Sequence, residues 1–274
     1  MIFDVYKIAS PLLSRYIQYI LFNYSSDISY SSLVTSFANT NICLGIINGK
    51  KLINRTDEVK FTEYKSGINS YISGMYLKPY KFEADGILDE ICIDFTPIGY
   101  YRFFKFPLRT YIFNEDILSE AFGNKSKDFF ETVFLVSDFQ IRGKLIEEYL
   151  LAKVIPCDTM FLEQCLYSIH RVSGEIRLNE LSTYLQCSEK KIVRAFLAAF
   201  DLTPKDYIRI VKFRNALANL NGNHAKSLTS VGYESNYYDQ SHFIRDFKFF
   251  TEKTPKEIKE VLLDIKQNVI IGIE

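Results

Sequence analysis

Apolar residues in the last hundred positions recur with the spacing of amphipathic helices. Leu178, Leu181 and Leu185 stand at i, i+3 and i+7, which places them on one face of a helix. Ser188 follows closely and is a good N-cap for a second helix. The apolar face of that second helix comprises Ile192, Ala195, Phe196 and Ala199. The pattern therefore predicts two helices joined by a tight turn, a helix-turn-helix.

The same unit occurs again about 50 residues later. An offset of 51 places Arg194 on Arg245, and Thr203-Pro204-Lys205 on Thr254-Pro255-Lys256. Upstream of the turn the offset is 50, because the second copy has one extra residue just after the turn. A repeat of this length indicates one supersecondary unit used twice, so we expect its function to be used twice as well.

The second copy carries the same structural signals as the first. Val231 lies on the buried face of its first helix, Asn236 lies at the turn, and Asp239 is the N-cap of its second helix. Phe243 and Phe247 form the buried face of that second helix. The second helix of a helix-turn-helix fits the major groove of DNA.

A Thr-Pro pair follows each second helix and begins a further helix. Thr is an N-cap, Pro suits the first helical position, and Asp206 and Glu257 stand where a capping box has its acid. The helix from Pro204 to about Leu220 would span ~25 Å. It would hold the two units so that they address successive turns of one DNA face, ~34 Å apart.

The first 113 residues have the short apolar runs and turn residues of a β-rich domain. Strands are expected at residues 41–49, 68–77 and 89–97, with turns at Asn48-Gly49, Lys78-Pro79-Tyr80 and Pro97-Ile98-Gly99. Residues 11–22 are interpreted as helical or mixed. Close strand spacing favours a small β-barrel or sandwich, so we predict an α+β chain.

The region from 115 to 155 has a helical pattern. Short amphipathic pieces are expected near 117–122, 127–135 and 139–151, and Pro156 ends the last of them. Such helices could either pack on the barrel or dimerise two chains, and the sequence favours neither. A helix from Thr159 to Arg171, closed by Ser173-Gly174, would open the C-terminal domain.

The string DQSHFIRDFKFFTEKTP, from Asp239 to Pro255, resembles the paired helix-turn-helix domain of the AraC/XylS family of bacterial transcription regulators. The first copy, LNELSTYLQCSEKKIVRAFLAAFDLTP, resembles it too, and the match covers roughly residues 159–263. Upstream, PLLSRYIQYILFNYSS and IDFTPIGYYRFFKFP resemble the cupin-like N-terminal domain of some members. The resemblance implies a cupin-like sensor or dimerisation domain at 1–113, a helical connector at 114–157 and a DNA-binding domain at 158–266.

Four positions depart from the family pattern. The family usually has Gly where this chain has Gln186, Asp201, Asn236 and Glu252. Asn tolerates the left-handed backbone conformation, whereas Gln, Asp and Glu cost ~1 kcal/mol or more there. We therefore expect local strain at these positions within an unchanged fold.

The outward faces of the two recognition helices supply the candidate DNA contacts. These residues are Ser188, Lys190, Lys191 and Arg194 in the first copy, and Gln240, Ser241, His242, Arg245 and Lys248 in the second. Arg and Gln can form bidentate contacts with guanine and adenine edges, while Lys most often contacts phosphate. An exposed charged helix face is usually only solvated, but the duplication favours a DNA role for Arg194 and Arg245. For His242 a structural role and a DNA contact are equally open.

Charge supports this interpretation only weakly. The chain has 33 Lys+Arg and 33 Asp+Glu, a formal net charge of zero. Residues 1–169 hold 17 basic and 20 acidic residues, and residues 170–264 hold 15 basic and 12 acidic ones. The asymmetry has the sign that DNA binding requires but is small, so we expect affinity to come from individually placed cations.

Candidate catalytic and metal chemistry is sparse. All three histidines (His170, His224, His242) lie in the C-terminal half, so a His-built metal centre in the barrel is excluded. Five scattered cysteines without a CxxC pair are expected to be reduced core thiols. The paired acids Asp89-Glu90 and Glu147-Glu148 are expected to be ordinary surface residues. We expect no enzymatic activity, no cofactor and no metal.

Aromatic residues of the β-rich part have two interpretations. The candidates are Tyr71, Tyr76, Tyr80, Phe82, Phe95, Tyr100, Tyr101, Phe103 and Phe104. They could line a ligand pocket, but packing as the barrel core is favoured because alternating aromatics fill small barrels.

Taken together, the sequence predicts a cytoplasmic transcription regulator that binds double-stranded DNA. The N-terminus lacks a signal-peptide pattern, and no apolar run is long enough for a membrane span. Its N-terminal domain would sense a small-molecule effector; alternatively it binds no ligand and serves only dimerisation or protein contacts. RNA polymerase and a second copy of the chain are further candidate partners.

Overall fold

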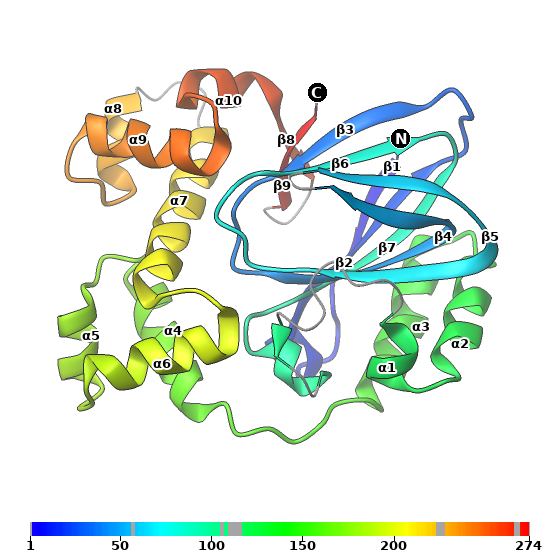
Figure 1. Cartoon of the computed structure of the whole chain (residues 1–274), viewed down its shortest axis with the longest axis horizontal. Helices are drawn as coiled ribbons and strands as arrows, with labels where there is room; N and C mark the ends of the chain where they lie inside the picture. The colour runs from blue at the N-terminus through cyan, green and yellow to red at the C-terminus, as the bar shows by residue number, and fades with distance from the viewer. Residues whose placement is uncertain are drawn as a thin grey trace.

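The computed structural model describes residues 2–55, 58–104, 107–108, 117–222, 228–265 and 269–273. Its strands form one curled sheet in the order β1-β2-β7-β4-β5-β6-β3-β9-β8, in which the edge strands β1 and β8 contact each other (Figure 1). The strands are β1 Ile2–Tyr6, β2 Ile17–Ser25, β3 Ser31–Ser36, β4 Ile42–Arg55, β5 Glu58–Ser73, β6 Tyr80–Asp85, β7 Leu88–Phe95, β8 Leu262–Ile265 and β9 Val269–Ile273. The predicted β-rich N-terminal part is confirmed.

The two faces of the sheet have different chemistry. Successive residues of a strand point to opposite faces, and β7 shows the consequence. Ile91 and Ile93 are fully buried in the main apolar core, which also includes Ile146 of the connector. Glu90 and Asp94 lie on the other face and line a cavity inside the curl. One strand therefore serves both as core and as cavity wall.

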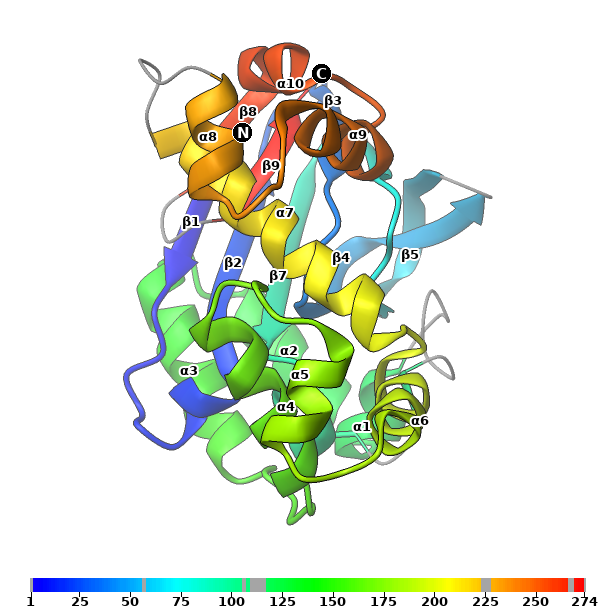
Figure 2. The same ribbon diagram turned by 90° about the vertical axis from the view of Figure 1, so that its left-hand side faces the viewer.

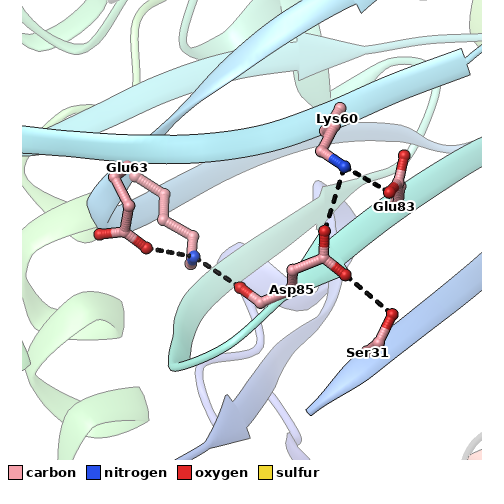
Figure 3. Close-up of polar contacts among 6 residues, drawn as sticks. Ser31, Lys60, Glu63, Glu83 and Asp85 are labelled. Atoms are coloured by element: carbon pink, nitrogen blue, oxygen red, sulfur yellow. Dashed lines mark hydrogen bonds and ion pairs between the residues drawn. The ribbon is translucent and has the colours of Figure 1, made fainter. Parts of the chain in front are cut away.

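A cluster of polar side chains links three strands next to a short stretch of backbone pairing. Strands β5 and β6 pair in parallel over only three residue pairs, from Glu58↔Lys81 to Lys60↔Glu83. Beside them Lys60 Nζ lies 3.1 Å from Asp85 Oδ2 and also contacts Glu83, while Ser31 Oγ donates to Asp85 Oδ1 at 2.8 Å (Figure 3). The Ser31 hydroxyl and Lys60 lower the pKa of Asp85. This cluster joins β3, β5 and β6.

Three helices cover the outer face of the sheet (Figure 1). They are α1 Leu118–Phe122, α2 Ser126–Phe134 and α3 Phe139–Leu151, close to the three predicted segments. Phe139 stacks on Phe22 of β2 with ring centroids 5.2 Å apart. Between the two alternatives for these helices, packing on the sheet is confirmed; dimerisation stays a prediction.

Paired acids expected at the surface are instead largely buried. Glu147 is 5% exposed and accepts a hydrogen bond from Tyr6 Oη at 2.6 Å. Asp89 binds Arg142 of α3, with Nη1 and Oδ1 2.7 Å apart. Glu90 is 4% exposed. The surface expectation is therefore wrong for these three, and of the four only Glu148 is exposed. Each buried acid is held by donors from neighbouring elements, which the local sequence does not reveal.

Of two local expectations in the sheet, the first holds only in its mixed form and the second is wrong. Residues 11–22, interpreted as helical or mixed, contain only a 3-10 turn at Leu13–Arg15 before β2 begins at Ile17. Strand β2 is apolar on both faces because the core lies on one side and the cavity on the other. It therefore lacks the alternation of polar and apolar residues that would distinguish a strand from a helix. Asn48-Gly49 forms no turn: β4 continues through it with a bulge, and Gly49 has a φ of +69°.

The C-terminal region is helical, as predicted, but its last residues return to the sheet. Its helices are α4 Met160–Arg171, α5 Leu178–Tyr184, α6 Glu189–Phe200, α7 Pro204–Gly222, α8 Leu228–Glu234, α9 Gln240–Thr251 and α10 Pro255–Val261. After α10, β8 and β9 form a hairpin whose β9 pairs with β3 at Val34↔Ile273. The sequence did not predict this pairing. The boundaries 1–113, 114–157 and 158–266 stay a proposal. Among the placed helices, none is long and apolar enough to cross a membrane.

Candidate DNA-binding surface and sheet cavity

The first recognition helix, α6, begins as the sequence predicted. Ser188 is its N-cap, with Oγ accepting from the Lys191 backbone N–H at 3.3 Å. Lys190, Lys191 and Arg194 are exposed, and Ser188 is exposed as well. The Lys191 ammonium lies 4.2 Å from the ring centroid of Phe161 on α4, a cation–π contact. That contact orients Lys191 along the surface of the domain.

The second recognition helix, α9, begins at the expected cap. Asp239 Oδ1 accepts from the His242 backbone N–H at 2.7 Å. Ser241, Arg245 and Lys248 are exposed. Gln240 is exposed too, and its side-chain oxygen accepts from Thr229 Oγ1 at 3.1 Å. The predicted candidates on this helix thus share the surface of the domain, apart from the half-buried His242.

His242 has contacts within the domain that support a structural role. Its ring meets Tyr237 edge-on with centroids 5.3 Å apart. Its Nε2 lies 3.9 Å from Asp246 Oδ2, while its side chain remains 42% exposed. Asp246 also binds Arg209 Nη2 at 2.9 Å. These contacts favour the structural alternative for His242.

Helix α7 separates the two units. Its 19 residues correspond to a length of about 28 Å. Thr203 and Asp206 form the predicted capping pair at its start, with Asp206 N donating to Thr203 Oγ1 at 3.1 Å. Helix α6 lies near one end of α7 and α9 near the other (Figures 1 and 2). Two recognition helices are therefore presented together on one rod.

Left-handed backbone conformations occur at all four positions where the family usually has Gly and this chain has another residue. The φ angles are 49° at Gln186, 56° at Asp201, 64° at Asn236 and 60° at Glu252. Ser173 joins them at 51°. Asp201 and Glu252 are the C-caps of α6 and α9, where a left-handed residue ends the helix. The predicted location of local strain is confirmed.

A cavity of about 140 Å³ lies inside the curl of the sheet. All seven strands from β1 to β7 line it, and Arg214 reaches it from α7. Of the nine aromatic candidates, Tyr71, Tyr76 and Phe82 are in its wall. Phe95, Tyr100, Phe103 and Phe104 are packed in the main core. The two interpretations of the aromatic residues thus apply to different subsets.

Glu90 is held in the cavity wall by neutral donors. Tyr71 Oη donates to Glu90 Oε1 at 2.6 Å, and Asn23 Nδ2 donates to Oε2 at 2.7 Å. Burial raises the pKa of Glu90, while the hydrogen bonds from Tyr71 and Asn23 oppose the rise. Tyr71 lies against Gly45, where any Cβ would be 2.2 Å from the ring. Gly45 therefore leaves room for the ring that satisfies Glu90.

Asp94 of β7 and Arg214 of α7 both line the cavity. Burial raises the pKa of Asp94 to about 7, and hydrogen bonds from Asn41 and Tyr19 together with the Arg214 charge oppose the rise. Burial lowers the pKa of Arg214, opposed by Tyr19, Tyr76 and Asp94. A cation from the rod between the recognition helices is thus electrostatically linked to the sheet.

Sequence reasoning overlooked these cavity residues. The alternation in LDEICIDF places Leu88, Glu90, Cys92 and Asp94 on one face and four other residues on the opposite face. Acids spaced two and four residues apart in a buried strand were a readable signal. Arg214 had no such signal, because its position in α7 resembles that of any helix cation.

Comparison with known proteins agrees with the geometry of the C-terminal region. A family model described as a helix-turn-helix domain matches residues 181–260, so this region is a helix-turn-helix domain. No curated protein matches the chain. ToxT from Vibrio cholerae resembles it at 17% identity and a TM-score of 0.41, over 88% of this chain and 98% of ToxT.

Two ligand-bound structures of ToxT give similar values. ToxT of strain SCE256 with a bound unsaturated fatty acid is 12% identical, with a TM-score of 0.44 over 88% of this chain and 94% of that one. ToxT of strain O395 bound to (E)-4-(8-methylnaphthalen-1-yl)but-3-enoic acid is 13% identical, with a TM-score of 0.42 over 94% and 98%.

Proposed function

We propose that the chain is a sequence-specific DNA-binding transcription regulator whose N-terminal domain controls its C-terminal domain. The observation that carries the proposal is the pair of recognition helices at the two ends of α7, within a region that matches a helix-turn-helix family model. DNA presents its major groove on one face at intervals of ~34 Å. Helix α7, about 28 Å long, therefore has a suitable length to place the two recognition helices in successive major grooves.

Arg194 and Arg245 are the proposed base-reading residues. They are exposed, occupy equivalent positions in the two units, and have side chains that can bind guanine bidentately. Lys190, Lys191 and Lys248 are assigned to phosphate, where a flexible ammonium is sufficient. Ser188, Gln240 and Ser241 stand at the starts of the two helices, from which they can reach base edges or phosphate.

Control by the N-terminal domain is proposed from the contacts between the two regions. Tyr101 Oη donates to the Ala199 carbonyl near the end of α6. The Lys78 ammonium lies 4.3 Å from the ring centroid of Phe249 on α9. Arg214 of α7 lines the sheet cavity. An effector in that cavity would contact both regions at once, and it would act by favouring one arrangement of them over another.

The DNA part of the proposal is tested with the full chain and a pool of random duplexes. We expect enrichment of two short elements whose centres are ~10–10.5 base pairs apart, one for each recognition helix. A folded chain that enriches no sequence would refute a sequence-specific regulator. Enrichment of only one element would refute the paired use of α6 and α9.

Control by an effector is tested against its alternative, an N-terminal domain that binds no ligand. Thermal shifts of the full chain with metabolite mixtures should identify a ligand that raises the melting temperature, because binding to the folded state alone stabilises it. Such a ligand must also change the affinity for the selected DNA. If no ligand raises the melting temperature, the result favours the alternative, in which the N-terminal domain serves self-association or contact with RNA polymerase. A ligand that binds and leaves DNA affinity unchanged would refute control of DNA binding by that ligand.

A further inference from the structure

The sheet cavity has an acidic end and a cationic end. Its charged wall residues among the described positions are Glu90, Asp94 and Arg214. Glu90 and Asp94 are four residues apart on β7, which corresponds to about 13 Å along a strand. Arg214 lies at the Asp94 end, where Asp94, Tyr19 and Tyr76 each favour its charge. The Glu90 end therefore has a carboxylate, and no cation among the described wall residues is directed at it.

Glu90 is buried with only neutral hydrogen-bond donors. Tyr71 Oη and Asn23 Nδ2 each donate to one oxygen of the carboxylate, and the Cys92 thiol is a third neutral hydrogen-bond partner. A carboxylate has about four acceptor sites, so these three partners leave acceptor capacity unused. Asn23 is 9% exposed, and its Oδ1 has no hydrogen-bond partner among the described residues. The Glu90 end of the cavity thus has more acceptor sites than donors.

Three aromatic rings stand beside this acidic end. Phe61 and Tyr71 have ring centroids 5.9 Å apart, and each lies 6.4 Å from Phe82. All three line the cavity. Aromatic faces attract cations, and the attraction is strongest where water is excluded. A carboxylate next to three rings is an environment that favours an ammonium group over a second anion.

We propose that the sheet cavity binds a small organic amine, with its ammonium group at Glu90 and a ring-sized apolar body against Phe61, Tyr71 and Phe82. The inference rests on the proposed role of the cavity as the effector site. The volume of about 140 Å³ sets the size, because a cavity of about 150 Å³ holds benzene. An anion would leave three negative groups facing one Arg214, whereas an ammonium pairs each buried acid with a cation.

The test uses three probes of nearly equal size and shape. They are 2-phenylethylamine, 2-phenylethanol and phenylacetate, which differ in the charge of one terminal group. Calorimetric titration of the full chain at pH 8 should give binding of the amine at least tenfold tighter than that of phenylacetate, with the alcohol between them. Equal or tighter binding of phenylacetate would overturn the proposal, and so would failure of the amine to bind.

Variants locate the site. Glu90→Gln keeps the shape and removes the charge, so we expect amine affinity to fall at least tenfold. Glu148→Gln changes an exposed acid on α3 outside the cavity and should leave amine affinity within twofold. Phe61→Leu, a second variant that keeps Glu90, should weaken amine binding about threefold to tenfold. Amine affinity unchanged in both Glu90→Gln and Phe61→Leu would place the ligand elsewhere and refute the assignment.

DNA binding of the same preparations separates this inference from the proposed function. If the chain binds its selected DNA but not the amine, only the ligand class is wrong. If it binds the amine and no DNA sequence preferentially, the regulator function is wrong and the amine site stands. An amine that binds at Glu90 and also shifts DNA affinity supports both.

Discussion

The two helix-turn-helix units have the same shape but different anchors to α7. In the first unit, Phe196 of α6 and Tyr207 of α7 form an edge-to-face aromatic contact with ring centroids 5.5 Å apart. In the second, Phe247 meets Phe213 at 5.2 Å, and Asp246 beside it binds Arg209 at 2.9 Å. The second unit thus adds a largely buried ion pair to the same aromatic packing.

The difference lies at one repeated position. An offset of 51 places Ala195 of the first unit on Asp246 of the second. Ala195 needs no partner, whereas Asp246 is 6% exposed and requires one. His242 also approaches Asp246, so three side chains depend on one another in the second unit. A duplicated fold can therefore be stabilised in two ways, one by apolar packing alone and the other with an added charge network.

The largest effects are expected where the two units are most alike. Phe196→Ala and Phe247→Ala each remove a fully buried ring, and each should lower the free energy of unfolding by about 3–5 kcal/mol. Chemical denaturation monitored by circular dichroism measures the loss. If the units are equivalent in their cores, the two values should agree within about 1 kcal/mol. A loss confined to one variant would show that one unit contributes little to the cooperative fold.

The next effect should distinguish the units. Asp246→Ala removes the carboxylate 2.9 Å from Arg209, which keeps only the longer contact of 3.8 Å with Asp206. Breaking a buried pair costs about 3–5 kcal/mol. Since the Arg209 side chain is 29% exposed, water screens part of this, and we expect about 2–3 kcal/mol. The double variant with Arg209→Ala should lose less than the sum of the single losses, because the pair is shared. Strict additivity in denaturation experiments would contradict a coupled network.

How far the sequence could predict these features depends on the range of the interactions. Helix caps such as Ser188 and Asp239 act within three residues, so they were readable in both copies. The left-handed conformation of Asn236 was readable from the resemblance, because the family usually has Gly at this position. Asp246 with Arg209 joins residues 37 apart, and β9 with β3 joins opposite ends of the chain. Local patterns do not encode such pairings.

The cavity shows the same limit at the proposed effector site. The face shared by Glu90 and Asp94 followed from strand alternation. Their burial did not, because it depends on the curl that brings seven strands around one space. The position of Arg214 was even harder to predict, because it lines the cavity from α7 in the C-terminal region.

Variants of the two recognition helices should weaken DNA binding moderately and show whether each unit recognises its own bases. Arg194→Ala and Arg245→Ala should each weaken binding to the selected DNA by about 1–3 kcal/mol and relax preference at different positions, about one turn apart. Lys144→Ala, an exposed cation on α3, is the matched control and should change affinity little. Gel-shift titrations on the selected and mutated duplexes measure both effects. Uniform weakening on every sequence would reassign these arginines to phosphate.

The smallest effects concern the four left-handed positions, where the units differ only in residue type. A non-glycine residue in this conformation costs roughly 1–2 kcal/mol, while glycine loses about 0.5–1 kcal/mol more backbone entropy on folding. Gln186→Gly should therefore stabilise by about 0.5–1 kcal/mol, whereas Asn236→Gly should change little because Asn tolerates φ > 0. Gln164→Gly, inside α4, is the matched control and should destabilise by about 1 kcal/mol. Equal responses at Gln186 and Asn236 in thermal denaturation would mean that residue type does not set the strain, and that the turn of the first unit is as relaxed as that of the second.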